Sequence, residues 1–286
     1  MIKSLITVYH PGCCVKENIR NIALQTDEVY ICDNSPQKSE ELCDFNIDNK
    51  INYIWFGENL GLSKAFNKVL LEQSFNDDDY IIFFDQDSSI SEGHIQKLIS
   101  EFEALEEQGE QIGCIAPVFF NTSNNTVESP RAKTPLNEHS FKVASVITSS
   151  MLCKYKDIKA INFWNERVFL DMADWDISWR LQESGKICVM TDAVTLKHSL
   201  GEGEKKVGPL KIRVGSAFRE YYQTRECLYL LTKKYTPLKF KIRFLAMLSV
   251  RPVIHLLFLN NRKARLKYII KGIKDFFCKK TGELKL

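Results

Sequence analysis

The sequence predicts an α/β protein in which a mostly parallel central sheet is flanked by helices and followed by a helical, basic C-terminal region. Strand-like and helix-like segments alternate through the first 120 residues, which is typical of a parallel sheet. Of the 286 residues, 44% are hydrophobic, which is enough to bury a core. Residues 236–286 contain thirteen Lys and Arg and two acidic residues, whereas residues 1–235 contain 26 basic and 34 acidic residues. We therefore expect an acidic body with a basic helical tail.

Five segments of the first half are typical of strands. Each is short, rich in β-branched or aromatic residues, and followed by turn residues. They are Ser4–Tyr9, Val29–Asp33, Ile51–Phe56, Tyr80–Phe84 and Ile112–Val118. Helical patterns lie between them, and Ser91 is the expected N-cap of the last one; they are near Lys16–Leu24, Gln37–Cys43, Leu62–Gln73 and Glu92–Glu107. Ligands of such sheets bind beyond the carboxyl ends of the strands. The polar residues that follow these strands are therefore expected to converge on one crevice: Asp33, Asn34, Asn59, Asp85 and Asp87.

The second half of the chain is less regular. It begins with a polar segment over residues 121–140, rich in Asn, Thr, Ser and Pro, which fits either a flap or an irregular hairpin. We then expect a strand at Phe141–Ile147, an extended segment at 163–170, a helix at Asp174–Ser184 and a strand at Ile187–Leu196. After Pro209 the pattern is helical to the C-terminus, with interruptions at Pro237 and Pro252.

Cysteine usage and hydropathy both favour a cytoplasmic protein. The nine cysteines are an odd number, without a CxxC pair or the spacing of zinc ligands, which indicates free thiols in a reducing compartment. The apolar run before His10 and Pro11 is too short for a signal peptide. No stretch reaches the roughly 18 uninterrupted apolar residues of a membrane-spanning helix.

Two carboxylates stand at the end of the fourth predicted strand. Asp85 and Asp87 follow the apolar run at residues 80–84, and like charges this close raise the pKa of one group or require a cation. Mg²⁺ and Mn²⁺ are bound by a few carboxylates together with phosphate oxygens. A metal site is therefore the favoured interpretation, and the alternative is that both acids only cap the helix expected near Glu92.

A DxD sequence after an apolar strand is known from two classes of enzyme. Phosphatases of the haloacid dehalogenase type carry it on their first strand, where the first Asp is a nucleophile. Nucleotide-sugar glycosyltransferases carry it after the fourth strand, where it binds metal. In this chain the motif follows about three strand-helix units, so its position favours a glycosyltransferase.

Further motifs in the expected order support that interpretation. ENLGLSKAFNKVL at 58–70 resembles the N-x-G-x-x-x-A-x-N pattern of family 2 inverting glycosyltransferases with the GT-A fold. FLDMADWDISWRLQESGKI at 169–187 resembles their F-x-x-x-E-D-x-D-x-x-x-R-x-x-x-G segment, with Ala173 in place of a Glu that the rhamnosyltransferase branch also lacks. LKHSLGE at 196–202 and FREYYQTRECLYL at 218–230 are similar to H-x-L-G and R-x-Y-Y-x-x-R-N, and FFDQDSSI resembles the D-Q-D-S of that branch.

The resemblance covers about residues 1–235 and implies a GT-A fold. It implies a nucleotide-binding half at 1–120, an acceptor and catalytic half at 121–208, and a helical region at 209–286. In an inverting transfer an acceptor hydroxyl attacks the anomeric carbon from the face opposite the leaving nucleotide, which needs a general base and a cation on the diphosphate. By resemblance, the donor is dTDP-L-rhamnose or a UDP-hexose, and the acceptor is a glycan on a polyprenyl diphosphate carrier.

The resemblance also implies roles for individual residues. Asp174 matches the catalytic base, although an acid at a helix start also serves as an N-cap. His198 matches a third metal ligand beside Asp85 and Asp87, although a lone histidine also occurs as a structural residue. The expected acceptor-binding residues are Asp171, Trp175 and Arg180. The expected donor-binding residues are Thr7, Tyr9, His10, Asp33, Asn59, Gly61, Asn67 and Asp85, of which Asp33 also fits a turn residue.

The basic tail allows two interpretations. Residues 238–280 mix apolar residues with Lys and Arg at near-helical spacing, as an amphipathic helix on an anionic membrane surface does. The alternative is a helix packed on the domain with an exposed basic face. Nucleic acid is not an expected partner, because the body is acidic and no nucleic-acid-binding module is recognisable. A non-catalytic nucleotide-sugar binder is disfavoured, because the motifs of both halves are present.

Overall fold

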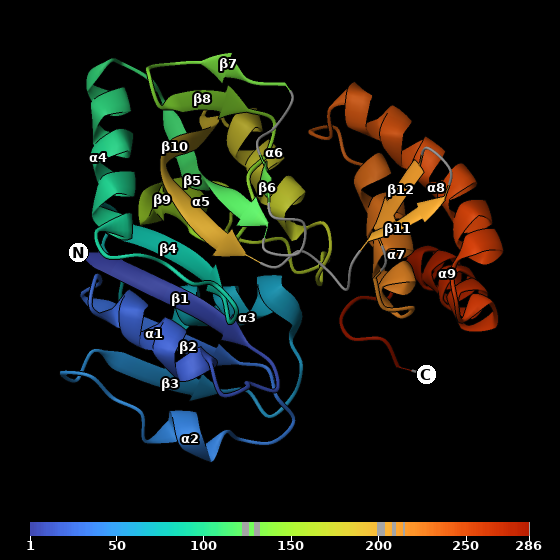
Figure 1. Cartoon of the computed structure of the whole chain (residues 1–286), viewed down its shortest axis with the longest axis horizontal. Coiled ribbons are helices and arrows are strands. Elements are labelled where there is room, and N and C mark those ends of the chain that lie inside the picture. Colours follow the sequence, from blue (N-terminus) through green and yellow to red (C-terminus); the bar gives the residue numbers. More distant parts are fainter. Residues whose placement is uncertain (122–125, 129–131, 199–203, 208–209, 214, 286) are drawn as a thin grey trace.

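The first half of the chain forms the parallel part of a mixed sheet. The computed structural model describes residues 1–121, 126–128, 132–198, 204–207, 210–213 and 215–285. β1 (Ile2–Val8), β2 (Glu28–Asp33), β3 (Ile51–Trp55) and β4 (Tyr80–Asp85) lie in the order β3-β2-β1-β4, and each neighbouring pair is parallel (Figure 1). These strands confirm the prediction, and their carboxyl ends lie at one edge of the sheet.

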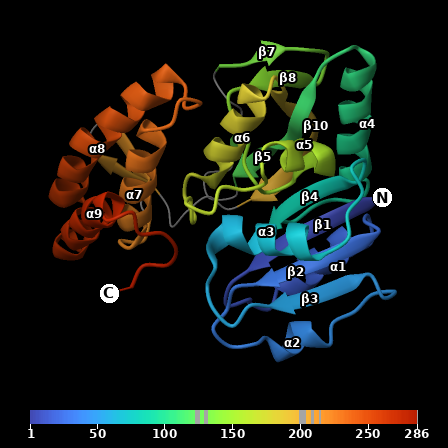
Figure 2. The same cartoon turned by 180° about the vertical axis from the view of Figure 1, so that it is seen from behind.

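Helices cover both faces of the sheet and bury one hydrophobic core on each. α1 (Val15–Ala23) and α4 (His94–Glu107) pack on one face, whereas α3 (Gly61–Glu72) and α6 (Ala173–Glu183) pack on the other (Figures 1 and 2). Alternate residues of β4 serve the two cores: Ile82 and Phe84 belong to the first, and Ile81 and Phe83 to the second. Burial on both faces explains the continuous apolar run before Asp85.

α4 begins two residues later than the sequence indicates. The predicted N-cap, Ser91, lies before a turn, and the N-cap is Gly93, whose φ is 71°. Glycine adopts this left-handed backbone without strain, so the chain turns there and the helix starts at His94. The short α2 (Glu40–Cys43) lies within its predicted range.

The second half adds further strands, of which β9 (Met151–Lys154) is marked by no sequence pattern and β10 (Ile187–His198) is close to its predicted range. β9 lies between β4 and β5 (Ile112–Asn121) and is antiparallel to both, while β10 runs parallel to β5. The four residues of β9 run directly into α5 (Tyr155–Ala160) without a turn signal. Three more short strands join the sheet: β6 (Thr126–Glu128), β7 (Thr134–Pro135) and β8 (Ser140–Val143).

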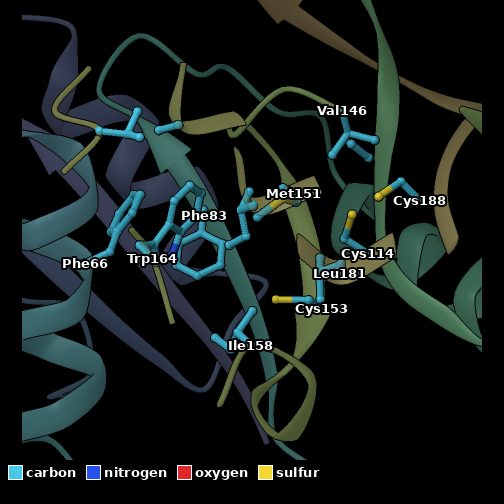
Figure 3. Packing of buried hydrophobic residues seen from close by; sticks show 14 of the residues in the cluster. Phe66, Phe83, Cys114, Val146, Met151, Cys153, Ile158, Trp164, Leu181 and Cys188 are labelled. Atoms are coloured by element: carbon cyan, nitrogen blue, oxygen red, sulfur yellow. The ribbon is translucent and has the colours of Figure 1, made fainter. Parts of the chain in front are cut away.

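One prediction for the second half is right in part and one is wrong. The strand expected at Phe141–Ile147 is present as β8 but ends at Val143, whereas the segment at 163–170, expected to be extended, consists of turns and irregular backbone. Its Trp164 packs inward instead, with ring centroids 5.3 Å from Phe66 of α3 and 5.0 Å from Phe83 of β4 (Figure 3). Aromatic residues suit a packed loop as well as a strand, so their pattern does not separate the two.

The C-terminal region forms a helical lobe beside α6. It contains α7 (Arg219–Leu231), α8 (Leu238–Phe258) and α9 (Arg262–Phe277) (Figure 1). Aromatic packing joins the lobe to the sheet domain: the ring centroids of Trp175 and Phe244 are 5.5 Å apart, and those of Trp179 and Phe240 are 4.7 Å apart. Within the described part of the chain, no helix has the length and the apolar character that crossing a lipid bilayer requires.

The helical prediction after Pro209 needs two corrections. Leu210–Arg213 forms a strand, β12, because it pairs antiparallel with β11 (Glu204–Val207). Pro252 does not end a helix: it lies inside α8, whereas Pro237 is the N-cap of α8. The predicted domain boundary, at residues 208 and 209, lies outside the described residues.

Candidate active site

A cavity of about 490 Å³ lies at the carboxyl ends of the parallel strands. Residues at the ends of β1, β2 and β4 and the loop before α3 form its polar side, and residues 169–170 and parts of the C-terminal lobe form its apolar side. This is where parallel sheets bind their ligands. The predicted donor-binding residues that line it are Thr7, Tyr9, Asn59, Gly61 and Asp85.

The cavity also contains residues outside the predicted donor-binding set. The strand-end rule marks Asn34, and it could also have found Gln86, which directly follows Asp85. Phe169 and Tyr222 lie within the family motifs, which do not mark them as cavity residues. Others come from the C-terminal end of the chain, where no sequence pattern indicates a site: Glu283 and Leu284.

Gly61 shapes the cavity because a larger residue does not fit there. Its φ is 75°, and a Cβ at this position would lie 2.5 Å from the Phe169 ring and 2.7 Å from the Phe169 carbonyl oxygen. The two backbones are in direct contact, since the Leu62 N–H donates to that oxygen at 2.9 Å. Asn59 Oδ1 accepts the Gly61 N–H at 3.0 Å, so the N-x-G pair builds the turn that starts α3.

Asp33 and His10 lie beside the cavity but do not line it. Asp33 is fully buried, and its two carboxylate oxygens accept hydrogen bonds from the Ser35 N–H at 2.8 Å and the Tyr53 hydroxyl at 2.5 Å. The His10 backbone N–H donates to Ser35 Oγ at 2.8 Å. These hydrogen bonds order the loop after β2. Asp33 thus has the turn role, which the sequence allowed beside the donor-binding role.

Three other predicted residues anchor the structure around the cavity. Asn67 binds the backbone of Trp164, with its Nδ2 2.8 Å from the carbonyl oxygen and its Oδ1 2.9 Å from the nitrogen. Arg180 binds Asp176 Oδ2 at 2.7 Å. Trp175 packs against α8 with its ring 5.3 Å from the Arg243 guanidinium. In the described part of the chain, none of the three lines the cavity at the carboxyl ends of the strands.

Asp85 and Asp87 flank Gln86 where β4 ends. Burial and the charge of Asp87 raise the pKa of Asp85 to about 7, against the effect of the Arg219 guanidinium. Adjacent carboxylates with this mutual repulsion fit a divalent cation, and Mg²⁺ or Mn²⁺ prefers such oxygen ligands. Among the described residues, no three His, Cys, Asp or Glu side chains are grouped as a metal site.

The predicted third metal ligand, His198, is the last residue of β10. The preceding residue, Lys197, forms an isolated bridge with Ser89, two residues after Asp87. This bridge brings the end of β10 next to the loop that carries the carboxylate pair. The side chain of His198 and the rest of the H-x-L-G motif lie outside the described residues.

Glu226 of α7 holds the segment that carries Asp171. Its fully buried carboxylate accepts the backbone N–H groups of four consecutive residues, Phe169 to Met172, at 2.9, 3.4, 3.0 and 3.3 Å. Burial and the charge of Asp171 raise the pKa of Glu226 to about 7, although Arg225 and the N–H donors oppose this rise. The sequence analysis missed Glu226, which stands where the R-x-Y-Y-x-x-R-N pattern has Asn.

Arg219 of α7 forms an ion pair with Asp171. Its guanidinium Nη2 lies 3.1 Å from Asp171 Oδ1. Burial raises the pKa of Asp171, and the charge of Arg219 lowers it. The charge of Arg219 also lowers the pKa of Asp85, so this guanidinium acts electrostatically on acids of two separate segments.

Asp174, the expected base, lies half-buried in the first turn of α6. Its Oδ1 accepts hydrogen bonds from the Thr148 backbone N–H at 3.2 Å and from the Thr148 hydroxyl. The next residue, Ser149, is hydrogen-bonded to Ser88, whose Oγ accepts the Asp85 N–H at 3.1 Å. Asp174 is therefore tied to the carboxylate loop through neighbouring residues, although it does not line the cavity.

A parallel half-sheet with a carboxylate pair after its fourth strand, and an acidic segment beside it, is the arrangement of GT-A glycosyltransferases. The model for "Glycosyl transferase family 2" matches residues 5–159. The chain belongs to glycosyl transferase family 2, which confirms the prediction from the motifs.

Individual relatives agree with this assignment. The dTDP-rhamnosyl transferase RfbF of Shigella flexneri is 25% identical over 289 residues, which cover 95% of this chain and 93% of that protein. The structure of GalNAc-T7 with UDP, GalNAc and Mn²⁺ has a TM-score of 0.61 and 13% identity, covering 98% of this chain and 56% of that chain. The structure of S. aureus TarS 1-349 in complex with UDP-GlcNAc has a TM-score of 0.60 and 13% identity, covering 96% and 80%. The chain thus spans about half the length of GalNAc-T7, and the shared fold is GT-A.

Proposed function

We propose that the protein transfers L-rhamnose from dTDP-L-rhamnose to a hydroxyl of a lipid-linked glycan, with inversion, in the synthesis of a bacterial surface polysaccharide. The observation that carries this proposal is the similarity to dTDP-rhamnosyl transferase RfbF, which extends over 95% of the chain. A UDP-hexose is the second candidate donor, because the similar folds of GalNAc-T7 and TarS were solved with UDP and UDP-GlcNAc.

In the proposed reaction the donor occupies the cavity with its diphosphate toward Asp85 and Asp87. Mg²⁺ or Mn²⁺ held by these two carboxylates would neutralise the charge that develops on the leaving diphosphate. Arg219 would supply a further positive charge near the diphosphate, since it pairs with Asp171 and its charge lowers the pKa of Asp85. The acceptor hydroxyl attacks the anomeric carbon from the opposite side.

Asp174 is the proposed general base, which removes the proton from the attacking hydroxyl. Its two hydrogen bonds from Thr148 orient the carboxylate. The link through Ser149 and Ser88 holds it in a constant relation to Asp85, as a base must be held relative to the reacting atoms.

The test measures dTDP release from dTDP-L-rhamnose with a lipid-linked glycan acceptor, with and without Mg²⁺ or Mn²⁺. Asp174→Asn should bind dTDP like wild type but lose transfer by about 100-fold or more. Asp87→Asn should lose the response of transfer to the metal, whereas Asp44→Asn, an exposed acid beside α2, should behave like wild type.

Three results would contradict parts of this proposal. Wild-type turnover by Asp174→Asn removes that residue as the base, and an unchanged metal response in Asp87→Asn removes the metal site. Transfer from UDP-hexoses but not from dTDP-L-rhamnose makes the second candidate correct. Release of inorganic phosphate through an aspartyl-phosphate would identify a phosphatase, which the position of the pair after β4 disfavours.

We also propose that α8 and α9 bind the cytoplasmic face of the membrane, where such an acceptor lies. Apolar side chains form an exposed stripe on each helix: Leu238, Ile242 and Leu245 of α8 are 72%, 61% and 58% exposed, and Ile270 and Phe277 of α9 are 56% and 73% exposed. Spacings of three, four or seven residues keep each stripe on one side of its helix. Lys and Arg on the same helices attract anionic lipid by about 1 kcal/mol per residue near the surface.

Sedimentation with phosphatidylglycerol vesicles tests the membrane proposal. Ile242→Asp and Phe277→Asp should each reduce the bound fraction, and exposed sites tolerate such changes without unfolding. Leu71→Asp is the matched control, since Leu71 is 63% exposed on α3. If Ile242→Asp and Phe277→Asp bind the vesicles as well as wild type and Leu71→Asp do, the lobe does not contact lipid.

A further inference from the structure

The last described residues of the chain return to the cavity. After α9 the C-terminal tail, residues 279–285, loops back toward the sheet domain (Figure 1), and its Glu283 and Leu284 line the cavity. Tyr222 of α7 and Tyr268 of α9 line the same side. None of the family motifs in the chain covers this tail, so the tail is a feature that the motifs do not explain.

Contacts from separate parts of the chain hold the tail in place. Arg225 Nη1 donates to the Gly282 carbonyl oxygen at 2.9 Å, and the Leu284 N–H donates to the Tyr222 hydroxyl at 2.9 Å. The Leu284 side chain packs on the cluster of buried aromatic residues that contains Phe169 and Tyr222. The tail therefore has a defined position set by α7 rather than a random path over the surface.

The tail acts as a wall of the cavity and not as a plug. With the tail in place the cavity still measures about 490 Å³, within the range of about 300–1,000 Å³ that small-molecule sites occupy. Leu284, Tyr222 and Phe169 contribute apolar surface to the cavity, and Asn34 and Asn59 contribute polar surface. A flat heterocycle fits such a site, because its faces are apolar and its edge carries hydrogen-bonding groups.

Glu283 lies at the end of the cavity away from the carboxylate pair. Its Oε1 accepts a hydrogen bond from Asn59 Nδ2 at 3.3 Å, and the Asn59 loop is joined to the end of β2 through the Leu60 N–H and Asn34 Oδ1 at 3.0 Å. β1 separates β2 from β4, so the ends of those two strands lie about 10 Å apart, two strand spacings. A diphosphate at Asp85 would thus avoid the charge of Glu283, and the nucleoside would lie beside the tail.

We propose that the C-terminal tail forms the nucleoside wall of the donor site. This inference rests on the proposed function, since it requires a pyrimidine nucleoside diphosphate in the cavity. Leu284 and Tyr222 cover one face of the pyrimidine, and Glu283 accepts a hydrogen bond from the ring N–H or a sugar hydroxyl. The tail thereby contributes to donor affinity although it lies more than 190 residues after the carboxylate pair.

Calorimetric titration of the full-length protein with dTDP and with UDP, in the presence of Mg²⁺, tests this inference. A chain that ends at Lys280 should bind dTDP about tenfold or more weakly, and Leu284→Ala and Glu283→Gln should each weaken binding about threefold to tenfold. Lys285→Ala is the control, because this exposed residue of the same tail does not line the cavity and should leave Kd unchanged. Thermal melting of each variant checks that it is folded.

Each outcome supports or overturns the inference. Unchanged dTDP binding by the shortened chain overturns it, and tighter binding overturns it in favour of a tail that competes with the nucleotide. Should the shortened chain fail to fold, Leu284→Ala and Glu283→Gln decide by the same criterion. If wild type binds neither dTDP nor UDP, the proposed function fails as well; if wild type binds and the tail variants bind equally well, only the role of the tail fails.

Discussion

Replacing Gly61 with alanine should destabilise the protein more than the same change at Gly93. Both glycines have a left-handed backbone, with φ of 75° and 71°, but their surroundings differ. A Cβ at Gly61 would meet the Phe169 ring at 2.5 Å and the Phe169 carbonyl oxygen at 2.7 Å, whereas a Cβ at Gly93 has nothing within 4 Å. Gly93→Ala therefore measures the backbone strain alone, and Gly61→Ala adds the steric clash.

The expected free-energy changes follow from these two terms. A non-glycine residue in the left-handed region costs about 1–2 kcal/mol, so Gly93→Ala should lower the free energy of unfolding by about that amount. Overpacking a well-filled site costs about 1–3 kcal/mol more, which gives a loss of about 2–5 kcal/mol for Gly61→Ala. Because Phe169 lines the cavity, Gly61→Ala should also weaken dTDP binding, and Gly93→Ala should not.

Urea unfolding followed by circular dichroism measures both stability losses. Equal losses for the two variants would show that the chain near Phe169 moves away at no cost. The close contact between the start of α3 and residues 169–170 would then not constrain the cavity, and the argument from Gly61 would be refuted.

Two further predictions concern buried groups. Glu226→Ala leaves four backbone N–H groups, two of them buried and two half-buried, without their acceptor. It should therefore lower the free energy of unfolding by at least about 3 kcal/mol, and a loss as small as that of the exposed Glu183→Ala would contradict this. Burial lowers the pKa of His94 to about 4, from the ordinary value of 6.5 that the unfolded chain retains, so the unfolded state takes up the proton first and stability is lost as the pH falls. Between about pH 7 and about pH 5 this loss should be about 2 kcal/mol greater in wild type than in His94→Gln, and parallel stability profiles would show that His94 does not titrate in this way.

The strands and helices of the first half could be predicted because each is marked locally. The apolar run of β4, buried on both faces, and the turn residues after it are visible in residues 80–90 alone. β9 and the turns at 163–170 could not be predicted in the same way. Their conformation depends on packing against β4 and α3, which are distant in the sequence.

The candidate site could be predicted in part for the same reason. Asp85 and Asn59 follow strands, and the strand-end rule places such residues at the cavity. Asp33 also lies at the end of a strand, and Asn67 belongs to the same N-x-G-x-x-x-A-x-N motif as Asn59. The polar atoms of both residues nevertheless bind neighbouring loops. Only the three-dimensional contacts distinguish a group that faces the cavity from one that supports its wall.

The sequence by itself determined the family, the order of strands and helices in the first half, and the carboxylate pair after β4. These depend on residue identity and on spacing along the chain, which a sequence states directly. Only the tertiary structure decided that Glu226 holds the Asp171 segment and that Glu283 reaches Asn59, a residue 224 positions away. Contacts of that kind are set by how the C-terminal helices pack on the sheet domain, and no local pattern in the chain encodes that packing.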